Sequence, residues 1–311
     1  MRCFAIKIFN LLNGEIYLDR KVLRNTVIFI ILVLLSGWIG VLVDSILPEQ
    51  PDDNSLGMGI WLVLPMLIAV VITIFSKGSW KDFGFKPNIK GNIKWYLIAV
   101  LIFPVVTAFV LIIGVTAKWI DLSTFDLRTL TIVFSSTLLF NFFKNIFDGA
   151  PLHSYLTSQL IKLNQNDWKI YLIVGGTWGT WHLPYYLVFL PETDLQAVLP
   201  GSRAVIPVFM IMIIVCWAVM FIELFRVTKS IWSGVVLHMV EDSLINPLVI
   251  SGFISIAAGK EILISPIAGI ITTILYLLIG LGIRTYRLQA SRMPLVDGES
   301  VNKNQSMDNN I

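Results

Sequence analysis

The sequence predicts an all-α fold, a polytopic bundle of about eight transmembrane helices that encloses a polar cavity. Of the 311 residues, 56% are hydrophobic and only 14% are charged, whereas soluble domains carry about 25% charged residues. The apolar residues gather in runs of about twenty, which is the length that a helix needs to cross a bilayer. Runs such as 26–43 and 205–222 are almost continuously apolar, so they do not fit the alternating strands of a membrane β-barrel. This pattern excludes a soluble enzyme with a single anchor.

The predicted spans form one domain. They cover residues 26–46, 57–76, 95–117, 129–147, 170–190, 205–225, 230–252 and 262–283. The first run is too long for a secretory signal, so we expect an uncleaved span. The segment 128–163 exceeds one span and is either one tilted helix or a span followed by an interfacial helix that starts near Pro151. We predict a cytoplasmic N-terminal segment (1–25), one transmembrane domain (26–285, with a core at about 80–250) and a disordered cytoplasmic tail (286–311).

The basic residues are distributed unevenly between the two sides of this topology. If the N-terminus is cytoplasmic, nineteen of the 23 lysines and arginines fall on cytoplasmic segments or span ends, as the positive-inside rule requires. We therefore predict a multi-pass protein of the plasma (inner) membrane with both termini in the cytoplasm. Its expected partner is the lipid bilayer, and a net charge of only +3 gives no support for a nucleic-acid partner.

All three histidines, His153, His182 and His238, lie in or beside predicted spans. Ionisable side chains within a membrane cost about 2.5–3.5 kcal/mol on insertion scales, so those that remain are candidates for function. His238 and Asp242 are four residues apart in the seventh span and therefore share one helix face. A single membrane histidine more often makes an interhelical hydrogen bond than performs chemistry, but three together favour a site.

The fifth predicted span contains small residues and a break. Trp178 lies one turn before His182, and Pro184 then disturbs the helix. The backbone groups that the proline frees must be buried in protein or face a watery cavity, so we expect a polar cavity near His182. Small residues on this span would let a neighbouring helix approach closely: Gly175, Gly176 and Gly179.

Three acidic residues near the spans have alternative interpretations. Asp148, at the end of the fourth span, could form a helix-surface ion pair with Lys144. Glu223 is expected to pair with Arg226 or to reach the membrane interface. Glu241 would point either to another helix or into the cavity.

Taken in order, these elements resemble the CAAX protease and bacteriocin-processing family, intramembrane peptidases that include the CAAX prenyl endopeptidases. The resemblance covers about 80–248 and begins with Trp-Lys-Asp-Phe-Gly-Phe-Lys-Pro. The family's second motif, an aromatic residue four positions before a histidine, matches Trp178 and His182. Its third motif, a histidine with Asn or Asp four residues later, matches His238 and Asp242.

The first motif departs from the family pattern of two adjacent glutamates with an arginine four residues after the second. Alignment places Asp148, Gly149 and His153 at these three positions. The second acid and the arginine are absent together, as expected of an ion pair, because one buried partner alone would cost several kcal/mol. Asp148 is one methylene shorter than glutamate, and a displacement of about 1 Å can slow catalysis about a hundredfold.

The resemblance implies peptide hydrolysis by an activated water, without a covalent enzyme intermediate. Asp148 and His182 would form the general base pair, and His238 with Asp242 would position the water or stabilise the oxyanion. The implied supporting residues are His153 and Trp178. An aspartate at 242 must be protonated to donate a hydrogen bond, whereas the family's frequent asparagine is a neutral donor. No cofactor is expected, and the rival chemistry is a divalent metal held by His182, His238, Asp148 and Asp242.

The favoured function is therefore an intramembrane endopeptidase that acts on a membrane-associated peptide or protein. The competing function is a catalytically degenerate relative that binds a peptide or membrane protein in immunity or regulation. Transport has less support, because no matching halves are visible in the sequence.

Overall fold

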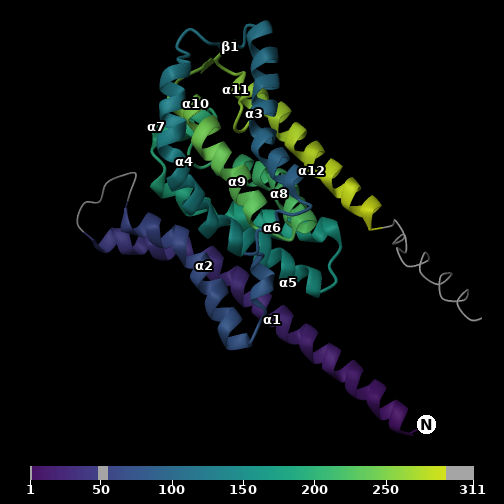
Figure 1. Ribbon diagram of the computed structural model, residues 1–311. Coiled ribbons are helices and arrows are strands. Elements are labelled where there is room, and N and C mark those ends of the chain that lie inside the picture. Colours follow the sequence, from purple (N-terminus) through teal and green to yellow (C-terminus); the bar gives the residue numbers. More distant parts are fainter. Residues whose placement is uncertain (1, 48–54, 292–311) are drawn as a thin grey trace, which may run out of the picture.

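Residues 2–47 and 55–291 are described by a computed structural model, in which the side chains of residues 2–19 are not described. The described part is almost entirely helical (Figure 1), so the predicted all-α fold is confirmed. Its two strands, β1 (Ile120–Asp121) and β2 (Ser255–Ile256), form one short antiparallel pair. The prediction for the tail beyond residue 291 lies outside the described residues, as does the loop 48–54.

Seven helical segments of the described chain are long and apolar enough to cross a membrane. The sequence predicts eight such spans, and seven of the predicted windows overlap these segments. The spans belong to α1 (Arg2–Ile46), α2 (Leu56–Ser76), α3 (Ile93–Thr116), the α4 segment (Leu127–Lys162), α8 (Ile206–Thr228), the α9 segment (Trp232–Ile250) and α12 (Ile270–Ala290). Shorter elements connect them: the 3₁₀-helix η1 (Trp80–Phe83), α5 (Thr157–Lys162), α7 (Glu192–Val198) and α11 (Glu261–Ile264).

The fifth predicted span is the exception. Its α-helix, α6 (Asp167–Trp181), has only 15 residues and is shorter than a membrane-spanning helix requires. The helix ends at His182, and the chain continues after Pro184 as η3 (Tyr185–Phe189), a π-helix. A proline lacks the N–H group that would continue the α-helical ladder, which accounts for the break at this point.

Three π-helices interrupt the bundle, and each lies beside a predicted site residue. The first, η2 (Ala150–Leu156), follows α4 (Leu127–Gly149), and η3 follows His182. The third, η4 (Glu241–Ile245), joins α9 (Trp232–Val240) to α10 (Asn246–Ile250). Wide turns of this kind occur mostly as local features near functional sites. Because α4, η2 and α5 form one continuous helical segment, the alternative of a separate interfacial helix near Pro151 is wrong.

The small residues of α6 allow close packing against α8, as predicted. A Cβ atom added to Gly175 would lie 2.7 Å from Val215 Cα, and one added to Gly179 would lie 3.0 Å from Ile211 Cα. A Cβ on Gly176 would meet nothing within 4 Å. Two of the three predicted glycines therefore make the helix contact, and the third does not.

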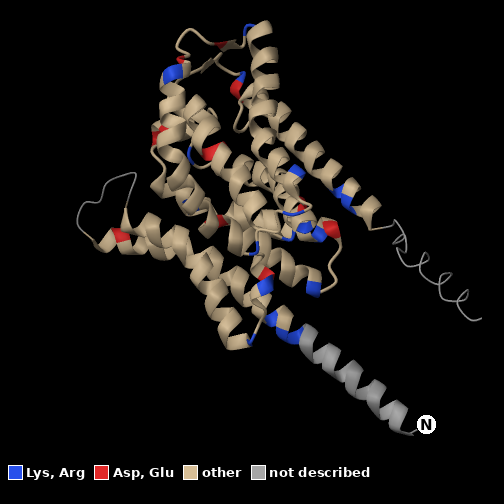
Figure 2. Ribbon diagram, viewed as in Figure 1, with Lys and Arg blue, Asp and Glu red and all other residues tan. Residues whose placement is uncertain are grey.

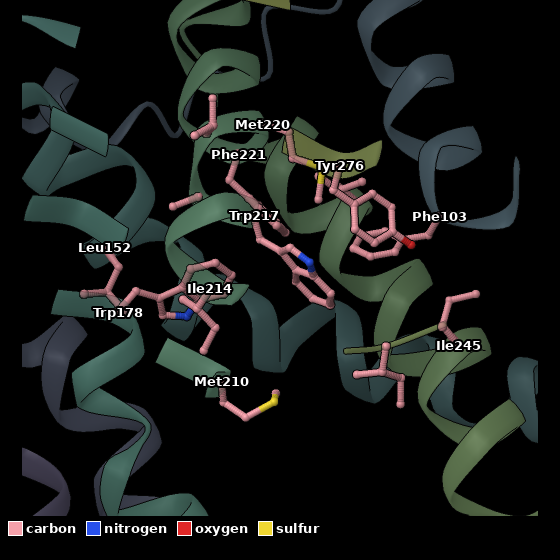
Figure 3. Packing of buried hydrophobic residues seen from close by; sticks show 14 of the residues in the cluster. Phe103, Leu152, Trp178, Met210, Ile214, Trp217, Met220, Phe221, Ile245 and Tyr276 are labelled. Atoms are coloured by element: carbon pink, nitrogen blue, oxygen red, sulfur yellow. The ribbon is translucent and has the colours of Figure 1, made fainter. Parts of the chain in front are cut away.

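Aromatic side chains join α3, α8 and α12 behind the site (Figure 3). The ring of Phe103 lies 5.4 Å from the ring of Trp217 and 4.8 Å from that of Tyr276, between ring centroids. Separations of this size are typical of stabilising aromatic pairs. The resulting core forms a rigid wall, and Trp217 also lines the cavity described below.

An ion network ties together the start of α6 and the ends of α8 and α12. Arg226 donates to Asp167 at 2.6 Å, and Arg287 donates to Glu223 at 2.5 Å. Glu223 also lies 3.4 Å from Arg226, which confirms that predicted pair. Burial alone would raise the pKa of Asp167, but hydrogen bonds and charge from Arg226, Arg284 and Arg287 outweigh it and lower the pKa to about 2. Figure 2 shows that charged residues lie mainly near helix ends, whereas the long helices are mostly uncharged between them.

Candidate active site

A cavity of about 520 Å³ lies between α2, α4, α6 and α8 and the π-helices η3 and η4. Most of its lining is aromatic or aliphatic, including Trp61, Met210 and Ile214. The ionisable side chains other than tyrosine that line it are Lys144, Asp148, His182, His238, Glu241 and Asp242. The predicted polar cavity near His182 is therefore present, and it contains all four residues that the sequence assigns to catalysis.

His182 has a defined tautomer. Its Nδ1 atom lies 2.9 Å from the backbone oxygen of Trp178, and a carbonyl oxygen can only accept a hydrogen bond. Nδ1 of the neutral ring therefore carries the proton, which leaves the Nε2 lone pair available to accept another. The rings of Trp61, Trp181 and Tyr186 surround the imidazole at centroid distances of 4.8–5.7 Å.

His238 lies between carboxylates on its two sides. Its Nδ1 atom is 3.4 Å from Asp148 Oδ2, and its Nε2 atom is 3.9 Å from Glu241 Oε2 and 4.0 Å from Asp242 Oδ2. These separations exceed those of good hydrogen bonds, and a bridging water would suit such gaps. The sequence pairs Asp148 with His182, but the histidine nitrogen within 4 Å of Asp148 belongs to His238. Helix α4 thus brings its acid to the histidine of α9.

Asp242 is held as an ionised acceptor. Lys144 Nζ lies 2.7 Å from Asp242 Oδ2, Asn145 donates to the same oxygen at 2.8 Å, and Asn246 donates to Oδ1 at 3.1 Å. The alternative interpretation of Asp148, a helix-surface ion pair with Lys144, is therefore excluded, because the ion pair of Lys144 is with Asp242. The reason is that α4 packs against η4, which brings a carboxylate from another helix to the lysine. Because three donors surround the Asp242 carboxylate, it accepts hydrogen bonds and cannot donate one to an oxyanion.

Glu241 points into the cavity, which decides between its two predicted orientations. Its side chain is buried and lines the cavity, with its carboxylate facing His238. The neighbouring Asp242 has an ion pair with Lys144 at 2.7 Å, whereas Glu241 Oε2 lies 3.9 Å from His238 Nε2. Glu241 is thus a third carboxylate of the site, outside the positions that the family motifs indicate.

The residues of the divergent first motif other than Asp148 do not line the cavity. His153 is buried, its ring 4.6 Å from Phe221 and 4.3 Å from Trp178 between centroids. A Cβ added to Gly149 would lie 3.7 Å from His153 Nδ1. A side chain at 149 would therefore point toward residue 153, which fits the inference that these two positions are occupied by an ion pair in the family.

Trp178 separates the two site histidines. Its ring centroid lies 5.9 Å from that of His182 and 5.8 Å from that of His238, edge-on in both cases. The ring is almost fully buried. Trp178 therefore packs against both histidines, and its backbone oxygen also sets the His182 tautomer.

Among the residues that the structure describes, one group of side chains could hold a metal ion. Ligand atoms of His238, Glu241 and Asp242 lie within 4.8 Å of one another. This group differs from the predicted rival set, because Glu241 takes part and His182 does not. The Lys144 ammonium already provides a positive charge at Asp242, so these side chains fit a divalent cation poorly.

Lys144 and Glu241 are the site residues that sequence reasoning did not assign to chemistry. Lys144 is the one lysine or arginine among the lining residues. Both residues had a sequence signal, because a charged side chain within a predicted span is a candidate for function by itself.

The comparison with protein families agrees with this geometry. Residues 130–244 match the model of a family described as Type II CAAX prenyl endopeptidase Rce1-like. The match includes Asp148, His182, His238 and Asp242. No curated protein and no solved structure matches the chain. Residues 130–244 of this helical membrane protein are thus similar to the Rce1-like type II CAAX prenyl endopeptidase family, in agreement with the CAAX protease and bacteriocin-processing family that the motifs resemble.

Proposed function

We propose that the protein is an intramembrane endopeptidase that hydrolyses a peptide bond in a membrane-associated peptide or protein. The observation that carries this proposal is the meeting of His182 and His238 from separate helices in one cavity, on either side of Trp178. The largely apolar lining suits a hydrophobic or lipid-modified substrate. We place the protein in a plasma (inner) membrane with both termini in the cytoplasm, on the basis of the charge distribution.

In this proposal His182 is the general base. Its Nε2 atom takes a proton from a water molecule while the water oxygen attacks the carbonyl carbon of the substrate. The same proton is then given to the nitrogen of the leaving amine as the C–N bond breaks. Asp148 and Glu241 flank His238 and orient its ring toward the attacking water.

Lys144 stabilises the oxyanion in this mechanism. The tetrahedral intermediate carries a negative charge on the former carbonyl oxygen, and a fixed donor beside it lowers the barrier. Asp242 cannot stabilise the oxyanion, because its carboxylate already accepts hydrogen bonds from Lys144, Asn145 and Asn246. The lysine ammonium has two further N–H donors and lines the cavity.

Cleavage of a diverse peptide library by the purified full-length protein tests this function. We expect products from the wild type and none from His182→Gln, a substitution that keeps the size of the side chain but removes the base. Lys169→Gln, an exposed change on the same helix, is the matched control and is expected to cleave normally. Equal cleavage by His182→Gln and the control would refute the assignment of the base.

A degenerate binding protein is the second candidate, and the first motif favours it. Gly149 has no side chain, and His153 does not line the cavity, so the family's second acid and arginine have no counterparts there. The variant Asp148→Glu/Gly149→Glu/His153→Arg rebuilds the family pattern. Cleavage by this variant combined with an inactive wild type would identify the native protein as a binder and would overturn the endopeptidase proposal.

A further inference from the structure

A second pocket, of about 360 Å³, lies where α1, the end of α2, η1 and α5 meet. It shares no lining residue with the cavity of the candidate active site. Lysines from three separate segments line it: Lys21 from α1, Lys77 directly after α2 and Lys162 from α5. The lining also includes neutral side chains that can donate or accept hydrogen bonds: Asn25, Thr73, Ser76, Ser79, Tyr155 and Gln159.

The lysines are anchored by neighbouring groups. Lys21 Nζ donates to the backbone oxygen of Ser76 at 2.7 Å, and Lys162 pairs with Asp82. Lys77 caps α2 in the left-handed conformation, with a φ of 52° and its backbone N–H bonded to the end of the helix. Because an ammonium group has three N–H donors, Lys21 and Lys162 keep donors for a ligand after these contacts are made.

The charge of the pocket suits an anion with more than one oxygen. Asp82 is the one acid among the lining residues, so three lysines leave a net charge of +2. The Asp82 carboxylate already accepts from Lys162 and from Gln159 at 2.9 Å, which directs its charge to those partners. A phosphate group has the matching charge and several acceptor oxygens.

The place of the pocket at the ends of two membrane-spanning segments favours a lipid over a free phosphate ion, because Lys21 lies at the start of the segment Arg20–Ile46 and Lys77 directly follows the segment Leu56–Ser76. These segments carry exposed apolar side chains. Leu23, two residues after Lys21, is 52% exposed, and Phe75, two residues before Lys77, is 85% exposed. Both belong to helices that are apolar enough to span a membrane, so these side chains are available to acyl chains. Basic pockets at the ends of transmembrane helices commonly bind lipid headgroups.

We propose that the pocket formed by Lys21, Lys77 and Lys162 binds the phosphate of an anionic phospholipid headgroup. The lipid would join α1 and α2 to η1 and α5, and therefore stabilise the position of α1 and α2 against the rest of the bundle. This proposal is independent of the proposed peptidase function, because none of these residues lines the candidate active site.

Native mass spectrometry of the detergent-solubilised full-length protein tests the proposal. The probes are phosphatidylglycerol, zwitterionic phosphatidylcholine, diacylglycerol without phosphate, and inorganic phosphate. We expect phosphatidylglycerol to bind at least tenfold more tightly than phosphatidylcholine. Lys21→Gln/Lys77→Gln should weaken phosphatidylglycerol binding about thirtyfold, since two charges near the headgroup are lost. The matched control Lys86→Gln/Lys90→Gln changes two exposed lysines outside the pocket and should bind as the wild type does.

A second variant distinguishes a loss of lipid binding from a loss of folding. Asn25→Asp keeps every lysine and almost the same side-chain shape but adds a negative charge to the pocket, and it should weaken phosphatidylglycerol binding as well. Equal binding of phosphatidylglycerol and phosphatidylcholine, or unchanged binding in both pocket variants, would overturn the proposal. Binding of inorganic phosphate without any preference of the protein for phosphatidylglycerol over diacylglycerol would assign the pocket to a free anion and overturn the lipid assignment.

Discussion

Removing Lys144 and Asp242 separately and together distinguishes a catalytic lysine from a merely structural ion pair. The two groups lie 2.7 Å apart, with side chains that are 28% and 9% exposed. Lys144→Met alone leaves the Asp242 carboxylate without its counter-charge, and breaking a buried pair in this way costs about 3–5 kcal/mol. Because Lys144 is partly exposed, we expect the variant to lose about 3 kcal/mol of unfolding free energy, the lower end of this range. This variant should therefore be both less stable and inactive.

The double variant separates the two effects. Lys144→Met/Asp242→Asn removes both charges, so most of the lost stability should return, because no buried charge remains unpaired at this place. If Lys144 stabilises the oxyanion, kcat should still be about 10²–10³-fold below that of the wild type, the usual effect of losing one such donor. Asp242→Asn alone leaves the lysine without its counter-charge and should lower stability, but it keeps the oxyanion donor and introduces the residue that is frequent in the family, so it should keep most of the activity.

The assay combines thermal unfolding in detergent with steady-state cleavage of a peptide that the wild type cuts. The informative comparison is kcat of the double variant against kcat of Asp242→Asn. Equal values would refute the oxyanion role and leave Lys144 as the counter-charge of Asp242. A change confined to KM would also contradict the argument, because a group that acts on the transition state must change kcat.

Three further outcomes are expected. Gly175→Ala should lower the unfolding temperature, because its Cβ would lie 2.7 Å from Val215 Cα, whereas Gly176→Ala, with open space around it, should be neutral or slightly stabilising. Asp167→Asn should lower the unfolding temperature at neutral pH. The pKa of Asp167 in the folded protein is lowered to about 2 from 3.8. The difference in unfolding temperature between wild type and variant should therefore persist above about pH 4 and shrink as the pH falls toward 2. Unfolding measured at a series of pH values between 2 and 7 tests this, and a difference that stays constant with pH would contradict it. Dialysis against a chelator should leave peptide cleavage unchanged, and a loss that Zn²⁺ restores would instead support the metal alternative.

The sequence was sufficient for features that depend on local pattern. Apolar runs predict the approximate positions of seven spans, although the fourth continues to Lys162 and the last is shifted to Ile270–Ala290. The four-residue spacing from His238 to Asp242 predicts a shared face. It was insufficient for contacts between helices. Lys144 has an acid four residues later in its own helix, yet it pairs with one that is almost a hundred residues away. Such a partner depends on which helices pack together, and the periodicity of one helix contains no information about that choice. Pro184 indicated that the helix is interrupted near His182. It did not indicate that the α-helix before it would be too short to span the membrane, because that depends on how the chain continues after the proline.

The wide turns at η2, η3 and η4 make the site sensitive to the length of the chain. A π-helix accommodates about one residue more per turn than an α-helix, and each residue of an α-helix advances the side chains by about 100°. Deleting a single residue within η4 would convert the wide turn into a regular α-helical turn, in which Glu241 and Asp242 would lose the directions relative to His238 that the wide turn gives them. The site would then lose its alignment although every charged and aromatic group remained in the chain, so the spacing within these turns is as much a part of the chemistry as the side chains themselves.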